Sequence, residues 1–289
     1  MRKIWLITTE HLEKELLFRD DDDFKAAMNF VAIQAACMPQ LSVLSFILMS
    51  NHVHFVLKGS WKDADGFITK FKHRYSCYYA KKWGKKKIFW RNGVDIKEIP
   101  YDDEATERAV AYVQMNCVAA NICVHPGQYP WGTGNCFFDQ TPTTGTPLEK
   151  LSARACERTF HTNSKVLPPT WHLSPDGYIP PQEYVDRKTV EELFRSPKRM
   201  SFFLSTSSKA RRRMERSENL PAFRDQIILA AAPDLCRSLF QKDSFQQLSA
   251  QEKTEFMRQI RFRFSADLNQ IARICGLSYA EAAIIFDSV

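Results

Sequence analysis

Two histidines separated by a single residue lie in an apolar part of the chain, in the run MSNHVHFVL at positions 49–57. Because side chains alternate across a β-strand, His52 and His54 would share one face while Val53 points into the core. Two neighbouring imidazoles are suitable ligands for a divalent metal. Taken alone, the pair is more typical of two half-exposed histidines on a solvated sheet face.

A second pair, Tyr112 and Asn116, lies in the run AYVQMN at positions 111–116. The two residues are four apart in a predicted helix, so they would project from the same helix face. A phenol can act as a nucleophile, but its unperturbed pKa of about 10 means that it needs activation. An amide oxygen can complete the ligand set of a hard metal that polarises a phosphate. Alone, the pair fits a core tyrosine and a solvated asparagine better.

Hydrophobic periodicity predicts the elements that would carry these residues. Strands are expected at 3–9, 41–49 and 52–58, helices at 22–37, 63–83 and 102–121, and a hairpin at 87–99. The first part of the chain is therefore predicted to be a mixed α and β domain. A mostly helical C-terminal region should follow it.

The two pairs, together with two further runs, resemble the single-tyrosine HUH transposase family, the REP-associated and insertion-sequence-200-like tyrosine transposases. The family commonly reads MPNHVHLLL around its histidines and RYIELNPVRA around its tyrosine, where this chain has AYVQMNCVAA at 111–120. FRDDDDF at 18–24 and YPWG at 129–132 resemble the family's FxDDxDF and YPWS. The resemblance covers roughly residues 1–138. Cys117 replaces the usual proline, and the chain is far longer than short family members.

The resemblance implies an HUH domain with a ferredoxin-like antiparallel sheet flanked by helices. It assigns the nucleophile to Tyr112, which would attack single-stranded DNA and leave a 5′-phosphotyrosine and a free 3′-hydroxyl. It assigns the metal ligands to His52, His54 and Asn116. The implied cofactor is a divalent metal, Mg²⁺ or Mn²⁺.

A basic and aromatic stretch favours nucleic acid independently of that resemblance. Positions 70–91 hold nine Lys or Arg residues and no Asp or Glu. Cations neutralise phosphates and aromatic rings stack on unpaired bases. The predicted DNA contacts are Lys81, Lys82, Trp83, Lys85, Lys86, Lys87, Trp90 and Arg91. A solvated basic face is the alternative, and Tyr75, Tyr78 and Tyr79 are rival nucleophiles.

Composition shifts divide the chain into three parts. Residues 1–138 form the predicted catalytic domain, 139–150 a Thr, Pro and Gly linker, and 151–289 a helical region. Positions 267–286 resemble a helix-turn-helix, with Ser278 and Glu281 as the capping box of its second helix. Because that helix lacks basic residues, a structural or dimerisation module is the alternative.

The bulk properties limit the remaining choices. The formal net charge is +7, which favours a polyanionic partner without identifying it. No apolar run is long enough for a membrane span or a signal peptide, so a cytoplasmic protein is expected. The expected partner is single-stranded or hairpin DNA, and a homodimer is left open. The rival function is a non-catalytic regulator that binds DNA or RNA hairpins.

Overall fold

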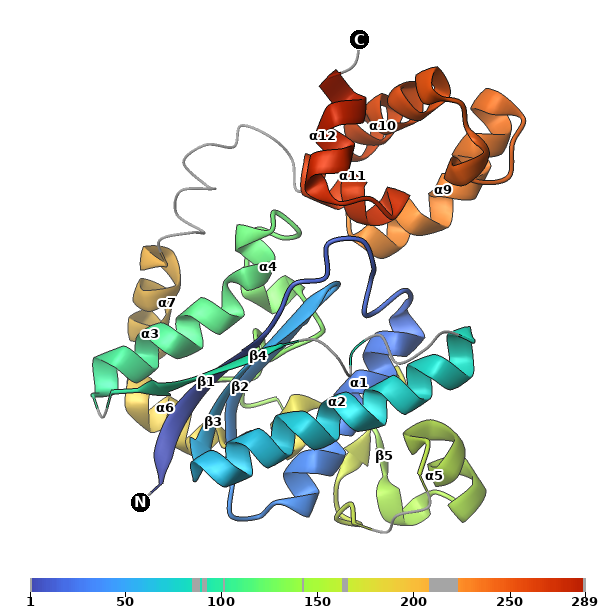
Figure 1. Ribbon diagram of the computed structural model, residues 1–289. Coiled ribbons are helices and arrows are strands. Elements are labelled where there is room, and N and C mark those ends of the chain that lie inside the picture. Colours follow the sequence, from blue (N-terminus) through green and yellow to red (C-terminus); the bar gives the residue numbers. More distant parts are fainter. Residues whose placement is uncertain are drawn as a thin grey trace.

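The computed structural model describes residues 2–84, 89, 93–100, 102–141, 143–162, 166–207 and 223–287 of the 289-residue chain. Its first elements are β1 (Lys3–Thr9), α1 (Asp21–Cys37), β2 (Ser42–Met49), β3 (His52–Gly59), α2 (Trp61–Trp83) and β4 (Val94–Ile99). The strands form a four-stranded antiparallel sheet in the order β2-β3-β1-β4. The predicted α+β class is confirmed (Figure 1).

Local capping signals explain where the first two helices begin and end. Asp20 accepts a hydrogen bond from the backbone of Asp23 at the start of α1, and Ser60 does the same for Asp63 at the start of α2. Asp21, Asp22 and Asp23 add negative charge to the first turn of α1, which the helix dipole favours. Helix α2 ends at Gly84, whose φ of 63° suits the left-handed cap.

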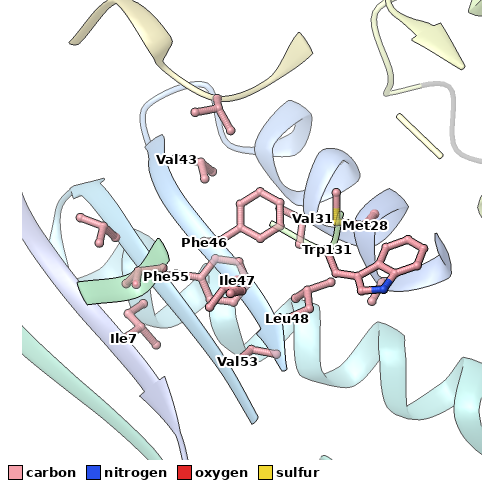
Figure 2. Packing of buried hydrophobic residues seen from close by; sticks show 14 of the residues in the cluster. Ile7, Met28, Val31, Val43, Phe46, Ile47, Leu48, Val53, Phe55 and Trp131 are labelled. Atoms are coloured by element: carbon pink, nitrogen blue, oxygen red, sulfur yellow. The ribbon is translucent and has the colours of Figure 1, made fainter. Parts of the chain in front are cut away.

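Helices cover both faces of the sheet. Phe55 of β3 packs against Phe67 and Phe71 of α2, with ring centroids 5.4 and 5.6 Å apart. Figure 1 shows α1 and α2 on this face and α3 (Asp103–Gln114) on the other. Figure 2 shows apolar residues of β2 and β3 packed with residues of α1 and with Trp131. Since neighbouring positions on a strand face opposite sides, His52 and His54 lie on the α3 side.

The helix predicted over 102–121 is divided in the structure. Helix α3 ends at Gln114, Met115 follows it, and α4 (Asn116–Ala119) continues the chain. The predicted hairpin at 87–99 also differs. Its described strand, β4, pairs with β1, and most of residues 85–92 lie outside the described part of the chain.

The part of the chain after position 138 is divided differently from the sequence prediction. Its next elements are β5 (Thr146–Pro147), α5 (Ala153–Phe160), β6 (His172–Leu173), α6 (Arg187–Phe194) and α7 (Pro197–Thr206). Short 3₁₀ turns lie at Pro126–Gln128, Leu148–Lys150, Pro181–Glu183 and Phe245–Gln247. Residues from Leu148 to Leu204 belong to the same hydrophobic core as the sheet. The core therefore extends past the expected linker at 139–150.

A second hydrophobic core begins at Ile228. It is built by α9 (Asp225–Phe240), α10 (Ala250–Phe264), α11 (Leu268–Cys275) and α12 (Tyr279–Asp287), which we call the C-terminal bundle. The predicted mostly helical character of this region is confirmed. None of the helices in the described ranges combines the length and apolar character that crossing a membrane requires.

Polar contacts join the C-terminal bundle to the first part of the chain. The side chain of Gln226 donates to the carbonyl of Phe18 at 2.7 Å. Lys14 and Glu281 form an ion pair at 2.8 Å, and Arg224 and Asp21 form one at 3.2 Å. The bundle therefore contacts the loop that follows β1 and the beginning of α1.

Candidate metal and nucleophile site

His52 and His54 lie side by side near the end of β3 and are almost fully buried. Their ring centroids are 4.8 Å apart and their planes are perpendicular. Strand β3 runs between β2 and β1, so both neighbours hold its register. This register gives the two imidazoles a fixed position on the α3 side of the sheet.

Two side chains fix the orientation of these rings. The Asn51 amide oxygen accepts from Nδ1 of His52 at 2.8 Å, and the Thr8 hydroxyl lies 2.9 Å from Nδ1 of His54. An amide oxygen can only accept, so Nδ1 of neutral His52 carries the proton and Nε2 keeps its lone pair. Both Nε2 atoms are buried. Such outer contacts orient histidines that bind metals through the other ring nitrogen.

A third histidine, His11, joins the pair and was missed by the sequence reasoning. Its ring stacks on His52 with centroids 3.6 Å apart and planes 14° apart. One ligand atom from each of His11, His52 and His54 lies within 4.8 Å of the others, so the cluster could hold a metal ion. In the sequence, His11 follows the end of β1 by two residues. This position indicates closeness to His52 only when β1 is known to pair with β3.

The loop that carries His11 is held by Asn51. The side chain of Asn51 donates to the carbonyl of Leu12 at 2.8 Å, and the Leu12 amide donates to the Asn51 carbonyl at 3.0 Å. Asn51 also orients His52. One residue of the turn between β2 and β3 therefore positions two of the three histidines.

Asn116, the predicted third ligand, lies on the wall of a cavity of about 540 Å³ that His11 and His52 also line. Its amide nitrogen donates to the carbonyls of Tyr112 at 2.8 Å and Val113 at 3.3 Å. The amide oxygen is bonded to the same carbon and lies on the other side of the group. Asn116 thus belongs to the cavity around the histidines, while its amide nitrogen is held by the end of α3.

Tyr112, the predicted nucleophile, contacts His54 edge to face, with ring centroids 5.4 Å apart and planes at 81°. The tyrosine is partly buried. Burial raises the pKa of its phenol, and the positive charge of Lys97 acts in the opposite direction. The phenol therefore needs a nearby cation or base before it can attack at neutral pH.

The three rival tyrosines lie on α2, across the sheet from the histidines. Tyr75 is fully buried and donates its hydroxyl to the carbonyl of Leu17. Tyr79 is buried as well, and burial raises the pKa of Tyr75, Tyr78 and Tyr79. Their position against the α1 side of the sheet separates all three from the histidine cluster.

The predicted DNA contacts have different surroundings. The ammonium of Lys82 binds Asp20 at 2.6 Å and the buried Asp23 at 2.9 Å. The indole nitrogen of Trp83 donates to Asp23. These contacts fasten α2 to the beginning of α1. Lys81 is exposed and lines a separate cavity. Lys85, Lys86, Lys87, Trp90 and Arg91 lie outside the described residues.

The C-terminal bundle completes the cavity around the histidines. Asn269, Gln270 and Arg273 of α11 line it, as does Tyr279 of α12. Arg273 is held by a 3.0 Å ion pair with the buried Asp225 of α9. The segment that resembled a helix-turn-helix in the sequence thus faces the histidine cluster.

The structure brings His52, His54 and Tyr112 together, and it adds His11 and the bundle residues to their surroundings. Comparisons of the chain with protein-family models, with curated proteins and with solved structures found no match. Function is therefore inferred from the residues and their geometry.

Proposed function

We propose that this protein is a metal-dependent enzyme that cuts and rejoins single-stranded DNA through Tyr112, in the manner of the single-tyrosine HUH transposases. The observation that carries the proposal is the contact between Tyr112 and His54, a buried member of the histidine cluster. A candidate nucleophile and a candidate metal centre thus lie against each other on one face of the sheet.

The arrangement of the first elements supports this family. The order β1-α1-β2-β3-α2-β4, with strands paired as β2-β3-β1-β4, consists of two interleaved βαβ units. This is the arrangement of a ferredoxin-like sheet, which the resemblance to the HUH family implies. Placing the histidines on β3 and the tyrosine on α3 agrees with the same resemblance.

The donor set fits a divalent transition metal. Three imidazole nitrogens from His11, His52 and His54 can reach one ion, and the oxygen of Asn116 is available from the cavity wall. Imidazole ligands suit Mn²⁺ better than Mg²⁺, which prefers oxygen ligands and retains its waters. Of the two expected metals, we therefore favour Mn²⁺. When bound, it would polarise the scissile phosphate and stabilise the charge that develops there.

The chemistry of Tyr112 is a transesterification. The phenol oxygen bonds to phosphorus and loses its proton, while the 3′ oxygen of the upstream nucleotide leaves as a hydroxyl. The downstream DNA remains attached to the protein as a 5′-phosphotyrosine. Because the phosphodiester energy is retained, attack by a 3′-hydroxyl can reverse the step and join strands without a nucleotide cofactor.

The cavity supports a single strand as the substrate. Its volume of about 540 Å³ is at the scale of a small-molecule site rather than a duplex. Asn269, Gln270 and Arg273 line it, and side chains of these types form hydrogen bonds with base edges. We propose that these residues contact bases next to the scissile phosphate.

A non-catalytic regulator that binds DNA or RNA hairpins is the second candidate. Its supporting observation is that several amide side chains and Arg273 line the cavity, which would serve binding as well as cleavage. A homodimer stays a prediction. Catalysis and binding differ in whether a covalent product forms.

One assay separates the two functions. Single-stranded oligonucleotides labelled on either side of the cut are incubated with the protein and Mn²⁺, Mg²⁺ or EDTA, then analysed on a denaturing gel. The enzyme proposal requires a metal-dependent adduct that carries only the downstream label. A protein that retains both labelled strands intact, or that binds RNA of the same sequence equally without cleavage, would be the regulator.

A further inference from the structure

A large cavity lies between α1, α2 and α5, on the face of the sheet opposite the histidine cluster. Its volume is about 1150 Å³. Each helix contributes one stripe of side chains at helical spacing. Helix α2 provides Lys70, His73, Arg74, Cys77, Tyr78 and Lys81, α1 provides Phe30, Gln34 and Cys37, and the segment from α5 onward provides Arg154, Glu157, Arg158, His161 and Thr162.

Cations line both long walls of this cavity. Lys70, Arg74 and Lys81 face it from α2, and Arg154 and Arg158 face it from α5. Within the described ranges, no ion pair is found for these five side chains, in contrast to Lys82 one residue further on. Glu157 also lines the α5 wall, so five cations face one carboxylate, and an anion between the walls would reduce the repulsion among the cations. The arrangement therefore favours a negatively charged occupant.

The floor of the cavity is aromatic. The rings of Tyr78 and His161 are 4.8 Å apart, and Phe30 lies beneath them at 5.9 Å from Tyr78. His161 is exposed by its overall surface area, but partial desolvation of its ring, together with the positive charges of Lys81 and Lys82, lowers its pKa. A half-buried tyrosine beside an exposed histidine and several cations offers an aromatic surface on which an unpaired base can stack.

A buried amide provides a further polar contact. Gln34 is 1% exposed, and its side-chain oxygen accepts no hydrogen bond from the described residues. It lies on the cavity wall between Phe30 and Cys37. A buried acceptor without a donor destabilises a protein. A ligand with an N–H group, such as a nucleic-acid base, could supply the missing donor.

We propose that this cavity is a second nucleic-acid site, which holds a stretch of single-stranded DNA or RNA by its phosphates and stacks one base on Tyr78 and His161. The spacing of the cations favours a strand over a free nucleotide. Lys70 and Lys81 are eleven residues apart on α2, which corresponds to about 16 Å along the helix axis. The phosphates of one nucleotide do not span that length, whereas successive phosphates of a strand do.

The proposal does not rest on the metal site, and its test is carried out with the full chain in EDTA. A ten-nucleotide single strand that carries a photoreactive thymine or uracil analogue is cross-linked to the protein, and the modified peptides are identified by mass spectrometry. We expect cross-links to Tyr78 or His161 with the DNA strand, the RNA strand or both. The relative yields identify the preferred nucleic acid. Cross-links confined to other regions would overturn the proposal.

Charge is tested by the salt dependence of binding, measured by fluorescence anisotropy. In Arg154→Ala/Arg158→Ala, the slope of log K against log salt should fall by about 1.4, since each phosphate that a cation neutralises on a single strand adds about 0.7. The matched control, Lys62→Ala/Lys188→Ala, removes two cations that do not line the cavity and should leave the slope unchanged. Equal slopes in the two double variants would refute the site.

Two further measurements complete the test. Gln34→Met removes the buried acceptor, so it should maintain or raise the thermal unfolding temperature while reducing the yield of the base cross-link several-fold. If Gln34→Met lost the cross-link but also unfolded at a lower temperature, the loss would follow from destabilisation. That result would count against a role for Gln34 in binding. A mononucleotide that displaces the strand at equal nucleotide concentration would overturn the choice of a strand as the ligand.

Discussion

The imidazole of His54 meets the phenol ring of Tyr112 edge to face, with centroids 5.4 Å apart. His54 is fixed on its other side by the hydroxyl of Thr8 on β1. Strand β1, strand β3 and helix α3 therefore converge on one imidazole. The sheet and α3 would hold the metal ligand His54 and the nucleophile Tyr112 at a constant separation. Attack on a metal-bound phosphate requires such a fixed separation.

Tyr112→Phe should form no covalent adduct with DNA, because it lacks the attacking oxygen. The ring and its packing against His54 remain, so the free energy of unfolding should change by no more than about 1 kcal/mol. DNA binding and metal binding should be unchanged. Labelled oligonucleotides on denaturing gels measure the adduct, and calorimetry measures the binding.

Tyr279→Phe is the control, since Tyr279 is a second tyrosine near the histidines and lines the cavity next to His11 and His52. It should still form the adduct. If Tyr112→Phe retained the adduct and Tyr279→Phe did not form it, the nucleophile would come from the C-terminal bundle instead.

Asn51→Ala and Thr8→Val should each lower the affinity for Mn²⁺ about 10-fold to 100-fold, the usual effect of removing a group that orients a metal ligand. Asn51→Ala should have the larger effect because Asn51 holds both His52 and the His11 loop. Isothermal titration measures the affinity. Asn269→Ala, on the cavity wall, is the control and should bind Mn²⁺ normally; equal affinities in all three variants would remove the orienting role.

Replacing His11 tests the ligand set. His11→Ala should weaken Mn²⁺ binding more than Asn116→Ala, because His11 offers a nitrogen next to His52 whereas the amide nitrogen of Asn116 is held by α3. The same titration decides the order. If Asn116→Ala had the larger effect, the ligand set implied by the family resemblance would be the better description.

Gly132→Ala should destabilise the protein by about 1–3 kcal/mol, the usual range for overpacking. A Cβ at Gly132 would lie 2.7 Å from the carbonyl oxygen of Phe46 on β2, and backbone atoms cannot give way easily. Gly66→Ala is the control, because its nearest neighbour would be 3.8 Å away and the residue is inside α2. That change should stabilise the helix by about 0.5–1 kcal/mol. Chemical denaturation of both variants gives the comparison.

A chain that ends at position 207 should retain metal binding, whereas a chain that ends at 140 should aggregate. The shorter chain lacks Ile179, Val190 and Phe194, which are fully buried in the first hydrophobic core. Truncation there would expose their partners to water. Size-exclusion chromatography and Mn²⁺ titration test this, and a folded, active product ending at 140 would contradict it.

Acid should loosen the contact between the C-terminal bundle and the loop after β1. The side chain of Lys14 and the cap of α12 lower the pKa of Glu281 to about 2 from its ordinary 4.5. The stabilisation from this ionised carboxylate is present above pH 4.5 and disappears as the pH falls from there towards 2. Hydrogen exchange of α12 and of the loop should therefore accelerate within that window.

Glu281→Gln should remove the pH dependence of this contact, and 1 M salt should imitate the variant because the pair is exposed. Glu252→Gln is the control. Its ion pair with Lys242 lies inside the bundle, so exchange should change in the bundle but not in the loop. An equal response of the loop to both variants would contradict the assignment.

The sequence predicted the sheet well because its strands are short apolar runs bounded by polar residues. The histidine strand and the helix that carries Tyr112 follow directly from periodicity. Met115 ends α3 inside a run that reads as continuous helix, and the side chain of Asn116 then donates to the carbonyl of Tyr112. Such a local rearrangement depends on hydrogen bonds that a propensity pattern does not contain.

The candidate site was predicted only in part, because strand order cannot be deduced from local pattern. His11 is 41 positions away from His52, and their contact depends on the antiparallel pairing of β1 with β3. The extent of the first core was missed for a related reason. A Thr, Pro and Gly stretch indicates irregular backbone, but it does not reveal that Val185 and Phe194 beyond it are buried in the same core.

Under the proposed function, the attachment of the C-terminal bundle limits the form of DNA that could reach the histidine cluster. A cavity closed on all sides would require a free end to be threaded through it. Here the contacts include the exposed ion pair of Lys14 and Glu281, which water can replace, and the buried hydrogen bond from Gln226 to the Phe18 carbonyl. For the proposed enzyme, a strand without a free end could therefore reach the histidines only if this buried hydrogen bond and the exposed ion pair both open.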